Sequence, residues 1–123
     1  MIRHEQDFIM RQIQMLMRFV ARILFGKDSI SAELSEEEIG EMGELYNRLN
    51  DLLQISDICN AEDMLHDNFT DSKDYLRIAI WFYNNLNTMT DEELETSDFS
   101  REEIHEGLQN ILSRSGIPLP TIM

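Results

Sequence analysis

The chain has 123 residues, of which 42% are hydrophobic and 28% charged, and its formal net charge at pH 7 is -14. This composition excludes a disordered chain, and the length suits one domain over residues 1–123. The negative charge argues against nucleic acid as a partner, because affinity for phosphates depends on Lys and Arg. Residues 1–27 nevertheless hold five Lys and Arg against two Asp and Glu. We therefore expect a basic amphipathic helix over 1–27, an acidic helical body over 35–115 and a short tail over 116–123.

The sequence also limits the expected cellular location. No apolar run approaches the roughly 20 residues that cross a bilayer, and the N-terminus lacks the apolar core and the cleavage site of a signal peptide. The single cysteine, Cys59, cannot form an internal disulfide, which suits a reducing compartment. We therefore expect a cytoplasmic protein.

The first predicted helix runs from about Glu5 to Phe25, and Gly26 stands where a left-handed residue ends many helices. At 100° per residue, its polar side chains fall on one narrow stripe: Arg11, Gln14, Arg18 and Arg22. Apolar side chains cover most of the remaining circumference, which is more apolar surface than one neighbouring helix would cover.

Three interpretations of this first helix stay open. It is the core helix around which the others fold, or an interface with a partner protein or a second copy of the chain, or a membrane-surface helix. The core interpretation comes first, because core helices need apolar faces too. An interface comes second, because exposed apolar patches on soluble proteins usually mark association. The acidic body opposes docking to anionic lipid, so membrane binding is the least favoured of the three.

Two further helices follow. Ser35 and Glu38 have the spacing of a capping box, so a second helix begins there and continues to about Leu53. Its apolar residues repeat at three and four positions, which indicates one buried face: Ile39, Met42, Leu45, Tyr46, Leu49, Leu52 and Leu53. A third helix is expected from about Asp57 to Asn68, with Ile58, Ala61, Leu65 and Phe69 turned inward.

The second half of the chain predicts a central helix and two more capped helices. Thr70 or Asp71 can cap a helix to about Asn87, and the apolar residues Leu76 and 78–83 cover every side of it, which is typical of a buried position. Capping boxes at Thr90 and Ser100 predict a one-turn helix and a final helix. The final helix runs from about Arg101 to Ser115, where Gly116 and Pro118 stop it.

The sequence holds no catalytic motif, because phosphate-binding glycine loops, a paired-histidine zinc helix and a nucleophile elbow are all missing. Two acidic-x-x-His steps, Asp63 to His66 and Glu102 to His105, are weak candidates for a di-metal centre on facing helices. Such a site needs inward carboxylates from two more helices, and no residue is marked for that role. We therefore expect no metal, no cofactor and no enzyme activity.

Two segments fit the first-helix pattern of a tetratricopeptide repeat, a large, an apolar, a small and an aromatic residue. They are Ile39, Met42, Gly43, Tyr46 and Tyr75, Ile78, Ala79, Phe82. Separately, the opening segment from Glu5 to Ile13 (EQDFIMRQI) and the later segment LFGK at 24–27 resemble a family of small uncharacterised bacterial proteins with acidic helical bodies. The resemblance covers most of the chain and implies a tetratricopeptide-like cytoplasmic protein. It supplies no activity for any residue.

The sequence therefore predicts an all-α fold of about five main helices in antiparallel hairpins, either tetratricopeptide-like or an irregular helical bundle. The expected function is a non-catalytic protein-protein interaction or adaptor module that binds a protein or peptide, or itself as a homodimer. Alternatives are a metal-binding helical-bundle enzyme and a membrane-surface protein. The expected contact residues are three stripe arginines and three apolar side chains: Arg11, Arg18, Arg22, Met10, Met17 and Tyr83.

Overall fold

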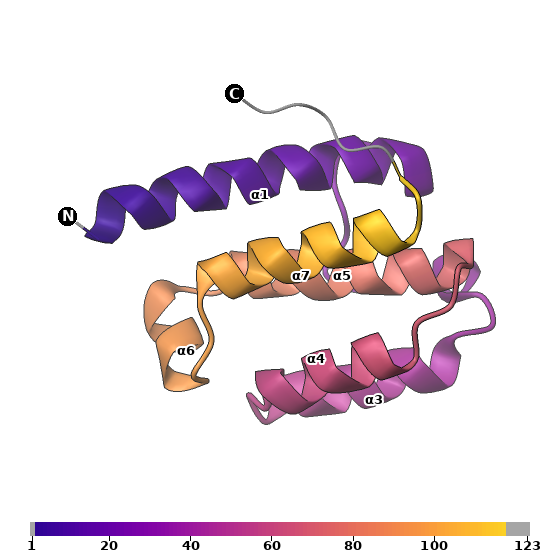
Figure 1. The fold of residues 1–123 in the computed structure, drawn as a ribbon. Helices are drawn as coiled ribbons and strands as arrows, with labels where there is room; N and C mark the ends of the chain where they lie inside the picture. The colour runs from indigo at the N-terminus through magenta and orange to yellow at the C-terminus, as the bar shows by residue number, and fades with distance from the viewer. Residues whose placement is uncertain (1, 118–123) are drawn as a thin grey trace.

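The computed structural model describes residues 2–117, with side chains from residue 7 onward. Throughout this range the regular structure is helical, in the order α1 (Ile2–Leu24), α2 (Glu36–Ile39), α3 (Gly43–Gln54), α4 (Ile58–Asp67), α5 (Lys73–Thr88), α6 (Asp91–Thr96) and α7 (Arg101–Arg114) (Figure 1). Five of these described helices have ten or more residues, which confirms the predicted all-α class. None of them is both long and apolar enough to cross a membrane.

Helix α5 lies at the centre of the fold. Helices α1 and α7 pack against it and against each other, while the α3–α4 hairpin lies on the side away from α1 (Figure 1). The hairpin meets α5 through an aromatic contact between Tyr46 and Trp81, whose ring centroids are 4.5 Å apart. All side chains from Ile78 to Tyr83 are buried. The prediction of a central helix is therefore confirmed.

The predicted second helix is wrong in one respect, because it is two helices with a break at Gly40. This glycine has φ +60°, a conformation that other residues adopt only with strain. A Cβ there would overlap the carboxylate of Asp74, which lies at the start of α5. The same carboxylate accepts a hydrogen bond from the backbone N–H of Glu41 at 3.2 Å. Asp74 thus holds the break, and it is too distant in sequence to be part of a local pattern.

The helix caps follow the sequence more closely. Capping boxes form at Ser35, Thr90 and Ser100, as their spacing predicts. Helix α5 is the exception, because its cap is Ser72 and not Thr70 or Asp71. The Ser72 hydroxyl accepts a hydrogen bond from the backbone N–H of Tyr75 at 3.1 Å, which places the start of the helix later than expected.

A buried arginine joins α5, α6 and α7. Arg101 is 4% exposed, and its guanidinium donates hydrogen bonds to the backbone oxygens of Asn87 and Met89, at 2.9 and 2.6 Å. It also donates to the side-chain oxygens of Asn87 and Asp91. The fixed fork of an arginine suits this task, because several acceptors are satisfied by one side chain.

Candidate functional site

Helix α1 has two faces of different character. Its inner face is in the core, where Ile13, Leu16, Val20 and Leu24 are all buried. Its outer face leaves apolar side chains in solvent. These form the α1 strip, which consists of Phe8, Met15, Phe19 and Ile23.

The α1 strip is large enough to need an explanation. Phe8 is 59% exposed, Met15 56% and Ile23 46%, while Phe19 between them is half-buried. Taking about 200 Å² for a fully exposed large side chain, these fractions leave roughly 300 Å² of apolar surface in solvent, a size at which surface patches are often functional. At 100° per residue, the four side chains fall within one narrow sector of the helix.

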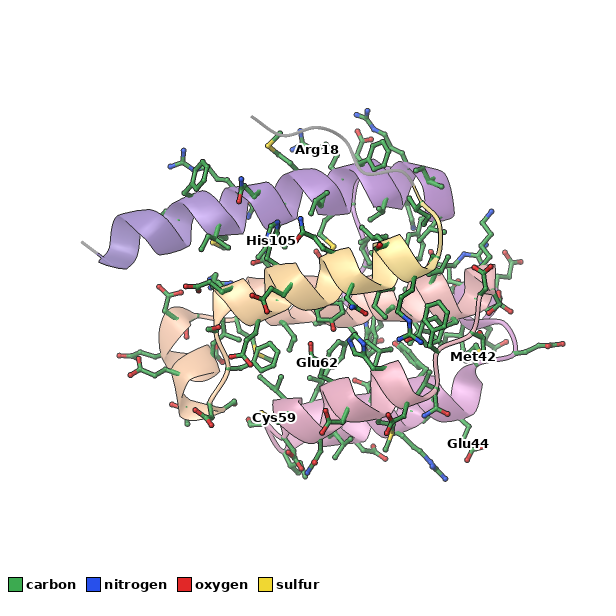
Figure 2. All side chains as sticks on the ribbon, viewed as in Figure 1. Arg18, Met42, Glu44, Cys59, Glu62 and His105 are labelled. Carbon is green, nitrogen blue, oxygen red and sulfur yellow. The ribbon has the colours of Figure 1, made fainter. Side chains whose placement is uncertain are left out.

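The three stripe arginines lie beside the α1 strip, on one flank of it. Arg11, Arg18 and Arg22 are exposed, as the sequence predicts for a polar stripe. Arg22 pairs with Asp28 at 2.6 Å, and the hydrogen bond between them lowers the pKa of Asp28. Within the part of the chain whose side chains are described, Arg11 and Arg18 make no ion pair. Two of the three guanidinium groups are therefore exposed and outside any ion pair, although the charge of Arg18 contributes to the lowered pKa of the nearby Asp28. Figure 2 labels Arg18.

A hollow of about 390 Å³ borders the same flank. It lies where α1 meets the connecting segment and α5, and its lining is Gln14, Met17, Arg18, Asp28, Ser29, Ile30 and Asn84. Two amides, a hydroxyl and the Asp28 carboxylate are among the groups that line it together with Arg18. The arginine flank is therefore next to a concave surface that can accept a polar side chain.

Of the three expected apolar contacts, only Met17 lines this hollow. Met10 is half-buried, and Met17 and Tyr83 are in the core, so their burial argues against direct contact with a partner. The sequence showed that α1 was too apolar for one neighbour, but it did not show which side would face α5. The exposed residues Phe8 and Met15 were missed for that reason.

A second candidate is a polar pocket of about 330 Å³ between α4 and α7. Its lining includes Glu62, Asp63, His66, Glu103, Glu106, Gly107 and Asn110. Below it, the Tyr83 hydroxyl donates a hydrogen bond to Glu62 Oε2 at 2.7 Å and lies 2.7 Å from His66 Nε2. Tyr83 has one proton, so His66 must donate through Nε2. Figure 2 places Glu62 between α4 and α7.

The electrostatics of this pocket follow from burial. Burial raises the pKa of Glu62, against the opposing effect of the Tyr83 hydrogen bond. Burial also lowers the pKa of His66 and raises that of Tyr83, and the nearby Glu62 adds to the latter shift. Gly107 lets α7 approach, because a Cβ there would overlap the Tyr83 hydroxyl. The three side chains thus form one hydrogen-bonded group, in which the Tyr83 hydroxyl joins Glu62 Oε2 to His66 Nε2.

The four weak metal candidates are not brought together. Asp63 and His66 line the polar pocket, whereas Glu102 is exposed and outside its lining. His105 is half-buried on the side of α7 towards α1 (Figure 2). In the described part of the chain, no three His, Cys, Asp or Glu side chains are placed to hold a metal ion.

A family model described as a family of unknown function (DUF6483) matches residues 3–116. None of the curated proteins and none of the solved structures matches the chain. The match agrees with membership of an uncharacterised family, as the opening segment indicated, and it assigns no activity to the α1 strip or to the polar pocket.

Proposed function

The chain belongs to the DUF6483 family, whose function is unknown, and we propose that it is a non-catalytic protein-interaction module that binds its partner through the outer face of α1. The exposed α1 strip is the observation that supports this proposal. Solvent exposure of two large side chains, Phe8 and Met15, costs free energy that a partner surface would recover. The arginine flank adds the polar rim that is typical of such interfaces.

The metal-enzyme alternative is placed second. Its two acidic-x-x-His steps face different sides of α7, since Asp63 and His66 lie in the polar pocket and His105 lies towards α1. Within the pocket, Tyr83 already hydrogen-bonds Glu62 Oε2 and His66 Nε2. An enzyme that used Glu62 and His66 would have to exchange these hydrogen-bond partners during its reaction. An interaction module would not.

The proposal includes a cytoplasmic location and a tetratricopeptide-like arrangement in part of the chain. The free, exposed thiol of Cys59 supports a reducing compartment. The α3–α4 hairpin, followed by α5, supports the repeat-like arrangement. Gly43 fits it less well, because a Cβ there would contact only Ile39, at 3.9 Å, and close helix packing is the usual reason for a small residue in the repeat.

Affinity capture from the host lysate tests the proposed function. A double variant, Phe8→Ser with Met15→Ser, removes most of the exposed apolar surface of α1 without touching the core. Ile55→Ser is the matched control, because Ile55 is 71% exposed but lies at the end of the α3–α4 hairpin, away from α1. We expect the native chain and the control to capture the same specific protein, and the double variant to lose it. Equal recovery by all three chains would contradict an interface on α1.

A further inference from the structure

Resting on the proposed function, we propose that the partner docks an acidic amphipathic helix along α1, with its apolar residues on the α1 strip and its carboxylates on Arg11 and Arg18. The proposal concerns the chemistry of the occupant. It combines the spacing of the strip, the two arginines beside it that make no described ion pair, and the shape of the adjoining surface.

The spacing fits a helix laid along a helix. From Phe8 to Ile23 the strip members are separated by seven, four and four residues, which are the intervals of helix-in-groove anchors. At 1.5 Å per residue the strip is about 22 Å long, so a partner segment of about 15 residues covers it. A shorter loop would leave one end of the strip in solvent.

The charge beside the strip selects an acidic partner. Arg11 and Arg18 are one heptad apart on the same flank, so a helix with Glu or Asp at the matching interval can pair with both. The hollow next to Arg18 is also lined by the Asn84 amide and the Ser29 hydroxyl, and the one carboxylate in its lining, Asp28, is already paired with Arg22. The acidic body of the chain is a lesser obstacle, because charges beyond about 8 Å are largely screened at physiological salt.

A second copy of the chain is a poorer occupant. A symmetric pairing puts α1 against α1, and the only acidic residues of this helix, Glu5 and Asp7, are at its N-terminal end. In an antiparallel symmetric pair the two arginine flanks would also lie on the same side and repel each other.

An anionic membrane is also less favoured. Lipid-binding segments carry about four to eight basic residues. Residues 1–27 hold five, but two of them, Arg22 and Lys27, are already paired with Asp28 and Glu38.

Two designed peptides test the proposal. One is an Ala-rich helix of about 20 residues with leucines at the strip intervals and Glu at the flanking positions, and the other has Lys in place of each Glu. Binding of each labelled peptide is measured by fluorescence anisotropy at low and high salt, with the native chain and with a variant carrying Arg11→Glu and Arg18→Glu. Both arginines are exposed and make no described ion pair, so the variant is expected to fold.

We expect the acidic peptide to bind the native chain and to lose at least about tenfold in affinity to the variant and to high salt. The lysine peptide should show the opposite preference. Binding of both peptides with equal affinity, or of neither, would overturn the acidic helix. If neither binds while lysate capture still depends on Phe8 and Met15, the interaction function stands and only this occupant is refuted.

Two further measurements address the other occupants. Co-sedimentation with phosphatidylcholine vesicles that contain phosphatidylserine, without peptide binding, would replace the proposal with a membrane role. A dimer in sedimentation velocity that Met15→Glu dissociates would replace it with self-association.

Discussion

Replacement by alanine should change the free energy of unfolding in opposite directions at two helical glycines, Gly107 and Gly43. Gly107→Ala gains about 1 kcal/mol of helix propensity, because alanine loses less backbone entropy on folding. At this position, however, the new methyl group would overlap the Tyr83 hydroxyl and Glu62. Overpacking of this kind costs about 1–3 kcal/mol, and a weakened hydrogen bond to a charged group costs a further 1.5–3 kcal/mol or so. We expect a net loss of about 2 kcal/mol.

Gly43→Ala is the matched control, because the nearest atom to its new methyl group is 3.9 Å away, in Ile39. It should gain about 0.5 kcal/mol. Urea unfolding followed by circular dichroism measures both changes, and the loss at Gly107 corresponds to a fall in Tm of about 6–10 °C for a domain of this size. If Gly107→Ala is as stable as the native chain, α7 does not approach Tyr83 as closely as described.

The remaining predictions concern buried charge and pH. Arg101→Met should cost about 3–5 kcal/mol in urea unfolding, because the oxygens of Asn87 and Met89 lose their donor, at about 1–3 kcal/mol for each buried group left unsatisfied. Arg48→Met is the control, because the exposed ion pair of Arg48 is worth at most about 1 kcal/mol, and similar losses would refute the role of Arg101. Glu62 has a raised pKa in the folded state, so its ionisation opposes folding and this destabilisation grows as pH rises above about 4.3. The free energy of unfolding of Glu62→Gln should therefore rise relative to that of the native chain between pH 4 and 7. A difference between the two chains that stays constant over this range would contradict the prediction. His66 has a lowered pKa in the folded state, because burial favours the neutral ring. Its contribution to the free energy of unfolding is therefore complete above about pH 6.5 and is lost as the pH falls further. An NMR titration of His66 should show a pKa below that of free histidine and an Nε2–H tautomer when neutral.

The sequence was sufficient where the signal was local. Capping boxes at Thr90 and Ser100 mark helix starts because both partners lie within one turn. The apolar circumference formed by Leu76 and residues 78–83 likewise placed α5 in the centre. The break at Gly40 was not predictable in this way, because it depends on a carboxylate from α5.

The candidate sites depended more on long-range packing. The arginine stripe could be read from helical spacing alone, but the side of α1 that remains exposed depends on where α5 and α7 pack. The group of Glu62, His66 and Tyr83 joins α4 to α5 across 17 to 21 residues, and no periodic pattern links them. Tyr83 was expected to contact a partner. It is buried instead, and its hydroxyl hydrogen-bonds Glu62 inside the fold.

Trp81 is the only tryptophan in the chain, and its surroundings make it an internal optical reporter. Its indole N–H donates to the backbone oxygen of Ala32 at 2.7 Å, in the segment that follows α1, while its ring lies against Tyr46 of α3. The emission of Trp81 therefore depends on two contacts of α5, one with the segment after α1 and one with α3. A shift of its emission to longer wavelength would signal that the segment after α1 has left α5, and an unchanged spectrum would mean that this segment and Tyr46 keep their contacts with Trp81.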